Sequence, residues 1–240
     1  MARVLVPLPD RDFDPTETAV PWKVLTRAGH EVVFATEEGA KAACDPLLVR
    51  DEGVLFGQLG AKDGPKQLYR EMQSSAAFAK PIAWRDVDPG AFDALVLPGG
   101  HAPGMKQYLG SEVLHAKVAT FARRNKPMGA ICHGVLVLAR SGALRGRRTT
   151  CLPKYMERIA YFTTAWKLGR YYRTYDAYVE DEVKAALDDP SCFVRGPIAL
   201  FSHGTEDDDR AAFVVEDGAY VSARWPGDAY LFAKKVLERL

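Results

Sequence analysis

The stretch Met128-Gly129-Ala130-Ile131-Cys132-His133-Gly134 decides the fold that the sequence predicts. An apolar strand over 128–131 runs directly into Cys132, and a helix is expected over 134–141. Two small residues, Ala130 and Gly134, stand two positions before and after the cysteine. A sharp strand-to-helix turn crowds the backbone and needs small neighbours, so the pattern predicts a nucleophile elbow that presents Cys132 at the edge of a sheet.

The position of Cys132 predicts a reactive thiol. Backbone amides and the dipole at a helix N-terminus stabilise a thiolate, which is the form that attacks carbonyl carbons. The alternative is that Cys132 is a small buried hydrophobic residue, the ordinary role of a lone cysteine at a strand end. We expect that ordinary role for Cys44, Cys151 and Cys192, which lack the flanking pattern.

A second motif, 97–104 (LPGGHAPG), ends the apolar strand expected over 94–97. Adjacent parallel strands end at the same sheet edge, so this turn should lie beside the elbow. Because a glycine pair lets backbone amides turn toward a neighbouring site, we expect the amides of Gly99 and Gly100 to form an oxyanion hole with that of His133.

Glu17, at the start of a helix expected over 17–28, belongs to the same edge because that helix follows the first strand. Its alternative role is to compensate the helix dipole.

Strands and helices alternate along the chain. Strands are expected at 4–8, 31–35, 94–97, 128–131, 148–152, 199–201, 212–215 and 220–222, and helices at 17–28, 68–78, 111–124, 134–141, 154–187 (with interruptions) and 227–240. This alternation predicts an α/β fold, a three-layer sandwich with a mostly parallel central sheet. We expect one domain over 1–240, with excursions at about 36–92 and 154–198. The tyrosine-rich tract 155–178 is interpreted as a helical layer on the core or as an aromatic wall around a ligand.

Composition narrows the class of protein. Hydrophobic residues make up 48% and charged residues 26% of the 240 residues, as in globular proteins. The net charge of +1 argues against a nucleic-acid binder and against a protein held on a membrane surface by basic residues. No apolar stretch approaches the length of a membrane span, and the N-terminus lacks a signal-peptide core, so we expect a cytoplasmic protein. The four cysteines show no Cys-x-x-Cys spacing, which predicts free thiols and no structural zinc site.

Three separated motifs, GAICHG (129–134), LPGGHAPG (97–104) and TETAVP (16–21), together resemble the ThiJ/PfpI superfamily, also called the DJ-one superfamily. The resemblance implies a flavodoxin-like fold of the class I glutamine-amidotransferase type. It is strongest to the branch of heat-shock chaperones and glutathione-independent glyoxalases (glyoxalase III).

Residue roles follow from this resemblance. Cys132 matches the nucleophile, His133 the catalytic histidine, Glu17 the buried acid near the sulfur and Gly100 the oxyanion-hole glycine. In this branch a further acid orients the histidine, and Glu157 stands at its position; its alternative role is an ordinary solvent-facing helix carboxylate.

The sequence also departs from its relatives. Thr26 stands where the chaperone members carry a metal-binding histidine, although Glu31 is kept, so we expect no metal and no cofactor. The segment 201–206 (FSHGTE) lacks the His-x-Glu pair of glutamine amidotransferases, which argues against glutamine hydrolysis. The segment 223–228 (ARWPGD) replaces a turn that lies near the pocket in relatives. Arg224 and Trp225, with His101, are therefore candidate substrate-binding residues, although this turn could equally pack under the last helix.

Three functions remain open. The first is a cofactor-free enzyme that converts small reactive carbonyls in stress defence, for example methylglyoxal to lactate, with His133 as the base. The second is a redox-sensing stress chaperone that holds unfolded clients. The third is a cysteine amidase or peptidase. The resemblance also implies a homodimer.

Overall fold

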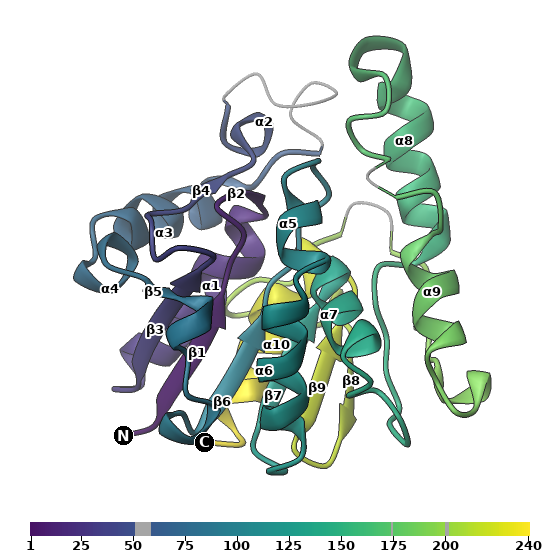
Figure 1. The fold of residues 1–240 in the computed structure, drawn as a ribbon. Helices are drawn as coiled ribbons and strands as arrows, with labels where there is room; N and C mark the ends of the chain where they lie inside the picture. Colours follow the sequence, from purple (N-terminus) through teal and green to yellow (C-terminus); the bar gives the residue numbers. More distant parts are fainter. Residues whose placement is uncertain (51–58, 174, 200–201) are drawn as a thin grey trace.

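The computed structural model describes residues 1–50, 59–173, 175–199 and 202–240 (Figure 1). Its strands are β1 (Arg3–Pro7), β2 (Arg11–Phe13), β3 (Glu31–Thr36), β4 (Ala43–Cys44), β5 (Ile82–Ala83), β6 (Ala94–Leu97), β7 (Met128–Ile131), β8 (Val214–Asp217) and β9 (Tyr220–Ala223). Its α-helices are α1 (Pro15–Arg27), α2 (Pro46–Val49), α3 (Asp63–Gln73), α4 (Ala76–Ala79), α5 (Met105–Leu109), α6 (Glu112–Ala122), α7 (Val135–Arg140), α8 (Lys154–Leu168), α9 (Val179–Ala185) and α10 (Ala229–Leu237).

A seven-stranded sheet in the order β5-β3-β1-β6-β7-β9-β8 forms the middle layer. Every neighbouring pair is parallel except β8 and β9, which are antiparallel. The predicted mostly parallel sheet is therefore confirmed. The central strands β6 and β7 are buried at every position, because helices cover both faces of the sheet.

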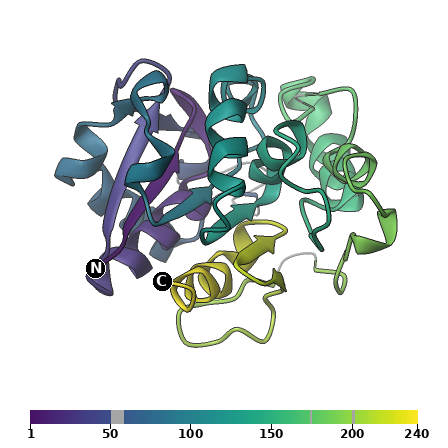
Figure 2. The ribbon, with the colours of Figure 1, turned by 60° about the horizontal axis from the view of Figure 1, so that its bottom comes forward.

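Helices form the two outer layers. Helices α1, α3 and α10 pack together on one face, and α5, α6 and α7 lie on the other, which Figure 2 shows from below. Gly129 in β7 allows α10 to pack closely against the sheet. A Cβ at this position would lie 2.6 Å from Val236 Cγ2 and 2.8 Å from Phe232 Cζ of α10. Helices α8 and α9 stand beside the β8 side of the sandwich (Figure 1).

The carboxyl ends of β1, β6 and β7 meet at one edge of the sheet. Leu97, the last residue of β6, pairs with Ala130 of β7, so the turns that follow these two strands are neighbours. Strand β1 lies on the other side of β6 and leads through β2 into α1. This edge therefore brings the three sequence motifs together, as parallel topology requires.

Some predicted elements differ from the structure. Residues 148–152 form no strand; Thr149 makes only an isolated bridge to Phe193, and the backbone N–H of Thr150 donates to the Ser222 hydroxyl. The helix expected at 68–78 is broken at Ser74–Ser75, where Ser75 caps α4. The strand expected at 199–201 falls largely outside the described residues, and Ala199 itself is not in a strand. Among the described residues, no helix is long and apolar enough to cross a membrane.

Candidate active site

Cys132 occupies a strained turn at the end of β7. Its φ of +57° lies in the left-handed region, which costs a non-glycine residue roughly 1–3 kcal/mol. Gly134 makes the turn possible, because a Cβ there would lie 2.1 Å from the backbone oxygen of Leu97 and 2.7 Å from that of Pro98. A single 3₁₀ turn over 132–134 then leads into α7. The predicted nucleophile elbow therefore has the crowded backbone that the flanking small residues indicate.

The N-terminus of α1 places Glu17 beside this turn. Asp14 caps the helix, and its Oδ1 accepts from the backbone N–H groups of Thr16 (2.7 Å) and Glu17 (3.0 Å). The backbone N–H of Asp14 donates to Gly99 O at 2.9 Å, while Glu17 Oε2 accepts from the Gly99 N–H at 2.9 Å. These two bonds tie the start of α1 to the glycine turn. Glu17 Oε1 is buried, and the Glu17 carboxyl hydrogen-bonds the Cys132 side chain, so the acid lies directly beside the thiol.

The Cys132 thiol and the Glu17 carboxyl form a coupled acidic pair. Burial raises the pKa of Cys132 well above that of an ordinary cysteine, and the charges of Glu17 and Asp14 raise it further, while the His133 amide opposes the shift. Burial also raises the pKa of Glu17 well above its usual value, and the Asp14 carboxylate adds to this effect. The pair therefore keeps at least one proton at neutral pH. Burial and the two neighbouring carboxyls therefore oppose the stabilised thiolate that the position of Cys132 at a helix N-terminus predicts.

The two histidines of the motifs lie next to each other behind the sulfur. His133 Nδ1 is 3.4 Å from Cys132 Sγ, and its ring centroid lies 4.8 Å from that of His101. Burial lowers the pKa of His133 well below its usual value, and the His101 and Arg140 charges act in the same direction. Burial and the Arg173 charge lower the pKa of His101 to about 4. Both imidazoles are therefore neutral at pH 7.

Glu157, near the start of α8, is brought to the site but does not hydrogen-bond His133. Its Oε1 accepts from Arg173 Nη1 at 3.1 Å, and its Oε2 accepts from the Val179 backbone N–H at 3.0 Å. Burial raises the pKa of Glu157 to about 7, against the lowering effects of these two partners. The expected direct orientation of His133 by this acid is absent among the described residues. Glu157 is buried, so its alternative role as a solvent-facing carboxylate is wrong.

His101, His133 and Glu157 each have a potential ligand atom within 4.8 Å of the others. Arg173 is paired with Glu157, and its positive charge opposes a cation at this point. We assign no metal to this cluster.

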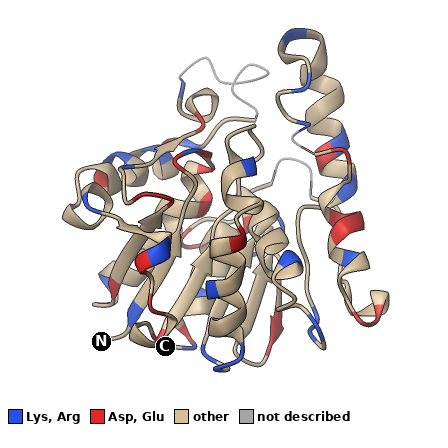
Figure 3. Cartoon of the chain, viewed as in Figure 1, with Lys and Arg blue, Asp and Glu red and all other residues tan. Residues whose placement is uncertain are grey.

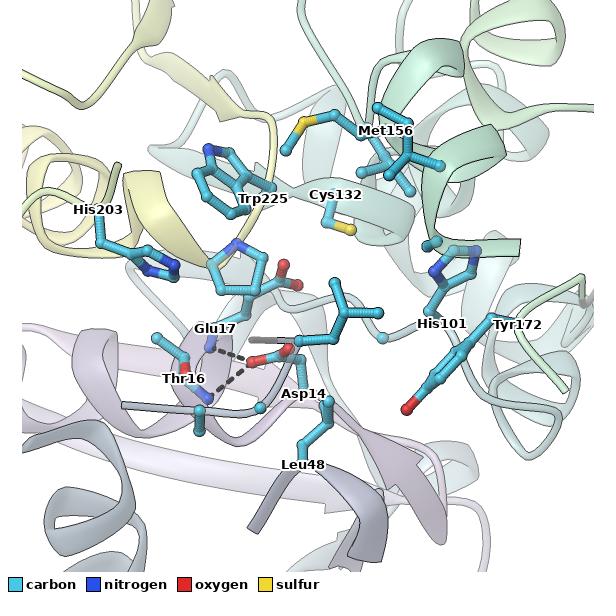
Figure 4. A pocket seen from close by; sticks show the side chains of 18 of the residues that line it. Asp14, Thr16, Glu17, Leu48, His101, Cys132, Met156, Tyr172, His203 and Trp225 are labelled. Atoms are coloured by element: carbon cyan, nitrogen blue, oxygen red, sulfur yellow. Dashed lines mark hydrogen bonds between the residues drawn. The ribbon is translucent and has the colours of Figure 1, made fainter. Parts of the chain in front are cut away.

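A cavity of 140 Å³ opens above Cys132 (Figure 4). Its polar lining includes Cys132, Glu17, Asp14, Thr16, Gly100, His101, Tyr172 and His203; the rest is Leu48, Leu59, Gly60, Ala61, Leu152, Met156, Ile159, Ala160, Ala199, Trp225 and Pro226. The sulfur, the Glu17 carboxyl and His101 face the same space (Figure 4). His133 is not among the lining residues. A group bound here would meet the sulfur and two carboxyls within mostly apolar walls.

The two glycines of the turn have different environments. The Gly99 amide donates to Glu17, so it is not available to an oxyanion, and this part of the predicted hole is corrected. A Cβ on Gly99 would lie 2.7 Å from the His133 nitrogen, which explains why this position needs glycine. Gly100 lines the cavity and remains a candidate oxyanion donor together with His133.

Two of the three candidate substrate-binding residues line the cavity, and one does not. His101 and Trp225 line the cavity as expected. Arg224 does not: it is buried in an ion pair with Asp228, where its Nε and Nη2 donate at 2.8 Å each, and its Nη1 donates to Pro197 O. Of the two predictions for Arg224, packing under the last helix is therefore confirmed, and the prediction that it binds substrate is wrong.

Sequence reasoning missed Asp14 and His203. Burial raises the pKa of Asp14 to about 6, and burial lowers that of His203 to about 4. The signal for Asp14 was present, because Asp14 and Glu17 have the spacing of a helix capping box. The His203 ring packs 4.6 Å from Trp225 across the loop before β8, a contact that no local pattern indicates.

A strained cysteine over a parallel sheet, with a buried glutamate beside it, defines an α/β protein of the nucleophile-elbow class. The chain belongs to the ThiJ/PfpI family: the model described as "ThiJ/PfpI family-like" matches residues 8–197. A deglycase of Pyrococcus abyssi is 27% identical over 242 residues, covering 99% of each chain. Protein/nucleic acid deglycase 2 of Escherichia coli is 29% identical over 153 residues, covering 63% of this chain and 72% of that protein.

Solved structures share the fold over the whole chain. Glyoxalase III of Candida albicans has a TM-score of 0.69 at 19% identity, covering 100% of this chain and 97% of that one. Both of these sequence relatives are named as enzymes, which indicates enzymatic activity in the family.

Proposed function

We propose that this protein is a cofactor-independent enzyme of stress defence that converts small 2-oxoaldehydes to 2-hydroxy acids, with methylglyoxal to lactate as the reference reaction. One observation carries the proposal: the Cys132 sulfur faces a small cavity directly beside the buried Glu17 carboxyl, which hydrogen-bonds the Cys132 side chain. A glyoxalase III among proteins of the same fold, and deglycases among the sequence relatives, support this substrate class.

The cavity favours a small substrate. Its 140 Å³ is well below the roughly 300–1,000 Å³ of pockets that enclose drug-sized ligands. A three-carbon oxoaldehyde needs little space, whereas a peptide bond with its flanking residues needs much more. The size of the cavity therefore supports a carbonyl enzyme over an amidase or peptidase.

The site supplies one group for each step. The Cys132 sulfur adds to the aldehyde carbon, and its proton passes to the aldehyde oxygen, giving a hemithioacetal. The amides of Gly100 and His133 would stabilise the developing oxyanion. A carboxylate then removes the proton from the former aldehyde carbon and returns it to the neighbouring carbon through an enediolate, leaving a thioester. Water hydrolyses the thioester, releases the hydroxy acid and restores the thiol.

Glu17 is the best candidate for the base in the proton-transfer step. It lines the cavity, whereas His133 does not, and its raised pKa makes its carboxylate a stronger base than an ordinary glutamate. The neutral His133 imidazole, 3.4 Å from the sulfur, would orient the thiol for attack. This division revises the expected mechanism, in which His133 was the base.

Lactate production from methylglyoxal without glutathione tests the proposal. Wild type and Cys192→Ala, which alters a thiol outside the cavity, should form lactate at equal rates, and Cys132→Ala should form none. An inactive wild type, or full turnover by Cys132→Ala, would refute the proposal.

A stress chaperone is a second candidate, because α8 carries exposed apolar side chains. Phe162 is 63% exposed and Trp166 is 79% exposed, so this part of the tyrosine-rich tract does not pack on the core as one interpretation expected. Exposed apolar surface of this kind binds unfolded segments. If the wild type and Cys132→Ala suppress client aggregation equally while Phe162→Ser/Trp166→Ser does not, and no lactate is formed, this function replaces the first. Val113→Ser on α6, which is 48% exposed, is the matched control.

A further inference from the structure

A second cavity is lined in part by Arg173, the residue that pairs with Glu157. It has a volume of 320 Å³ and is lined by Pro103, Lys106, Arg170, Arg173, Tyr175 and Asp176. Lys106 comes from α5, and the others from the turn before it and from the segment between α8 and α9. That segment runs between α5 and α8 in Figure 1, and Figure 3 shows basic residues on both sides of it.

The lining has an excess of positive charge. Three of the six residues are cationic, and Asp176 is the single carboxylate among them. Asp176 pairs with Arg170 at 2.6 Å, but both side chains are largely exposed, so solvent screens this pair and leaves it weak. An anion that enters the cavity could compete for Arg170 at little cost.

Lys106 has no ion pair or hydrogen bond to any residue in the described ranges; its ammonium lies 5.9 Å from the centre of the Tyr175 ring. It is therefore a charged donor with all its hydrogen-bonding capacity available. The ring of Tyr175 also packs against Arg140, whose guanidinium lies 4.6 Å from the ring centre. This packing fixes the wall of the cavity that Tyr175 forms.

Arg173 connects this cavity to the catalytic residues. Its Nη1 donates to Glu157 Oε1 at 3.1 Å and to the backbone oxygen of Ala177 at 3.2 Å, and its Nη2 donates to the backbone oxygen of Asp176. Its guanidinium also stacks 4.0 Å from the centre of the Tyr178 ring. These contacts hold a largely buried guanidinium at the cavity. The Arg173 guanidinium, held in place on one side, and the Lys106 ammonium on the other supply the positive charge that an oxyanion with several acceptor oxygens needs.

We propose that this cavity is a binding site for a small oxyanion of the phosphate class, such as phosphate or a phosphomonoester, held by Lys106, Arg170 and Arg173. It is separate from the 140 Å³ cavity above Cys132, and the two share no lining residue. The proposal does not depend on the reaction catalysed at Cys132.

Titration calorimetry with inorganic phosphate tests the site at constant ionic strength, with chloride replaced by phosphate. The wild type should bind phosphate at one site. Lys106→Ala should weaken the affinity at least about tenfold, because one charge-assisted bond is lost, and Lys106→Glu should abolish binding. Lys80→Ala is the matched control, since it removes the same charge from an exposed position outside the cavity.

Lys106 is exposed, so neither substitution should disturb folding, which circular dichroism checks. Equal affinity in Lys106→Ala and Lys80→Ala would show that phosphate binds elsewhere and would overturn the proposal. The absence of saturable phosphate binding by the wild type would also overturn it. Tighter binding of acetate or lactate than of phosphate would reject the phosphate class.

Discussion

Replacing Gly134 by alanine should collapse the elbow that presents Cys132. The new Cβ would lie 2.1 Å from the Leu97 oxygen and 2.7 Å from the Pro98 oxygen, where ordinary contacts are 3.4–4 Å. Relief requires the elbow and the end of β6 to separate by more than 1 Å, and both oxygens belong to backbone that cannot rotate away. Inserting a methyl group into a packed core costs about 1–3 kcal/mol, and this contact should lie at the upper end.

A loss of about 3 kcal/mol corresponds to a fall in Tm of roughly 6–12 °C for a chain of this size. Urea unfolding and a thermal scan should show that loss, together with a fall in lactate formation. Gly64→Ala is the matched control: the nearest atom to its Cβ would be Tyr230 Oη at 3.8 Å, and it lies in α3. That variant should keep its activity and gain up to about 1 kcal/mol from helix propensity. If Gly134→Ala matched the wild type in both Tm and turnover, the crowded elbow would be refuted.

Three further variants test the site and its support. Burial raises the pKa of Asp14 from 3.8 to about 6, so its ionisation costs folded-state stability as pH rises from about 4 to 6. Asp14→Asn keeps the helix cap and should be roughly 1–3 kcal/mol more stable than wild type at pH 7.5, with the difference vanishing near pH 4 in urea unfolding; a pH-independent difference contradicts this. Arg224→Met leaves the buried Asp228 carboxylate without its partner and should lower the free energy of unfolding by about 3–5 kcal/mol, measured with urea. The control Arg210→Met removes an exposed ion pair and should have no measurable effect. Similar losses in both would argue against the buried pair. Glu17→Gln should fold normally and lose about 10²–10⁴ of the lactate rate, and a rate within threefold of wild type would exclude Glu17 as the base.

The sequence predicts the core of this fold because parallel strands carry an unambiguous pattern. The bounds 94–97 and 128–131 agree with β6 and β7, since both strands are apolar throughout and end at glycine or cysteine turns. The pattern of residues 148–152 also predicts a strand, but the structure has none there. The Thr150 N–H donates to the Ser222 hydroxyl, and Thr149 forms only an isolated bridge with Phe193. The sequence of a short segment does not determine which group its backbone N–H groups donate to in the folded protein.

The site residues that the sequence predicts are those whose place follows from a neighbouring strand, and the others depend on contacts with distant residues. Cys132, Glu17 and Gly100 are predictable because each follows a strand at the same sheet edge. Sequence reasoning leaves Arg224 undecided between packing and substrate binding, since its partner Asp228 lies four residues away and both could equally face solvent or core. The direction in which the pKa of Cys132 shifts is not predictable from the sequence, because it depends on how deeply the sulfur is buried, which the packing of the whole edge decides.

A covalent bond between the Cys132 sulfur and the substrate's aldehyde carbon is seen most directly by ¹³C NMR. The protein, in excess, is mixed with methylglyoxal labelled at that carbon. Wild type and Cys192→Ala should show a protein-bound hemithioacetal or thioester carbon that decays as labelled lactate appears, and Cys132→Ala should show neither. A bound carbon of the same kind in Cys132→Ala, or lactate formed by wild type with no bound carbon at any time, would contradict nucleophilic catalysis by this cysteine.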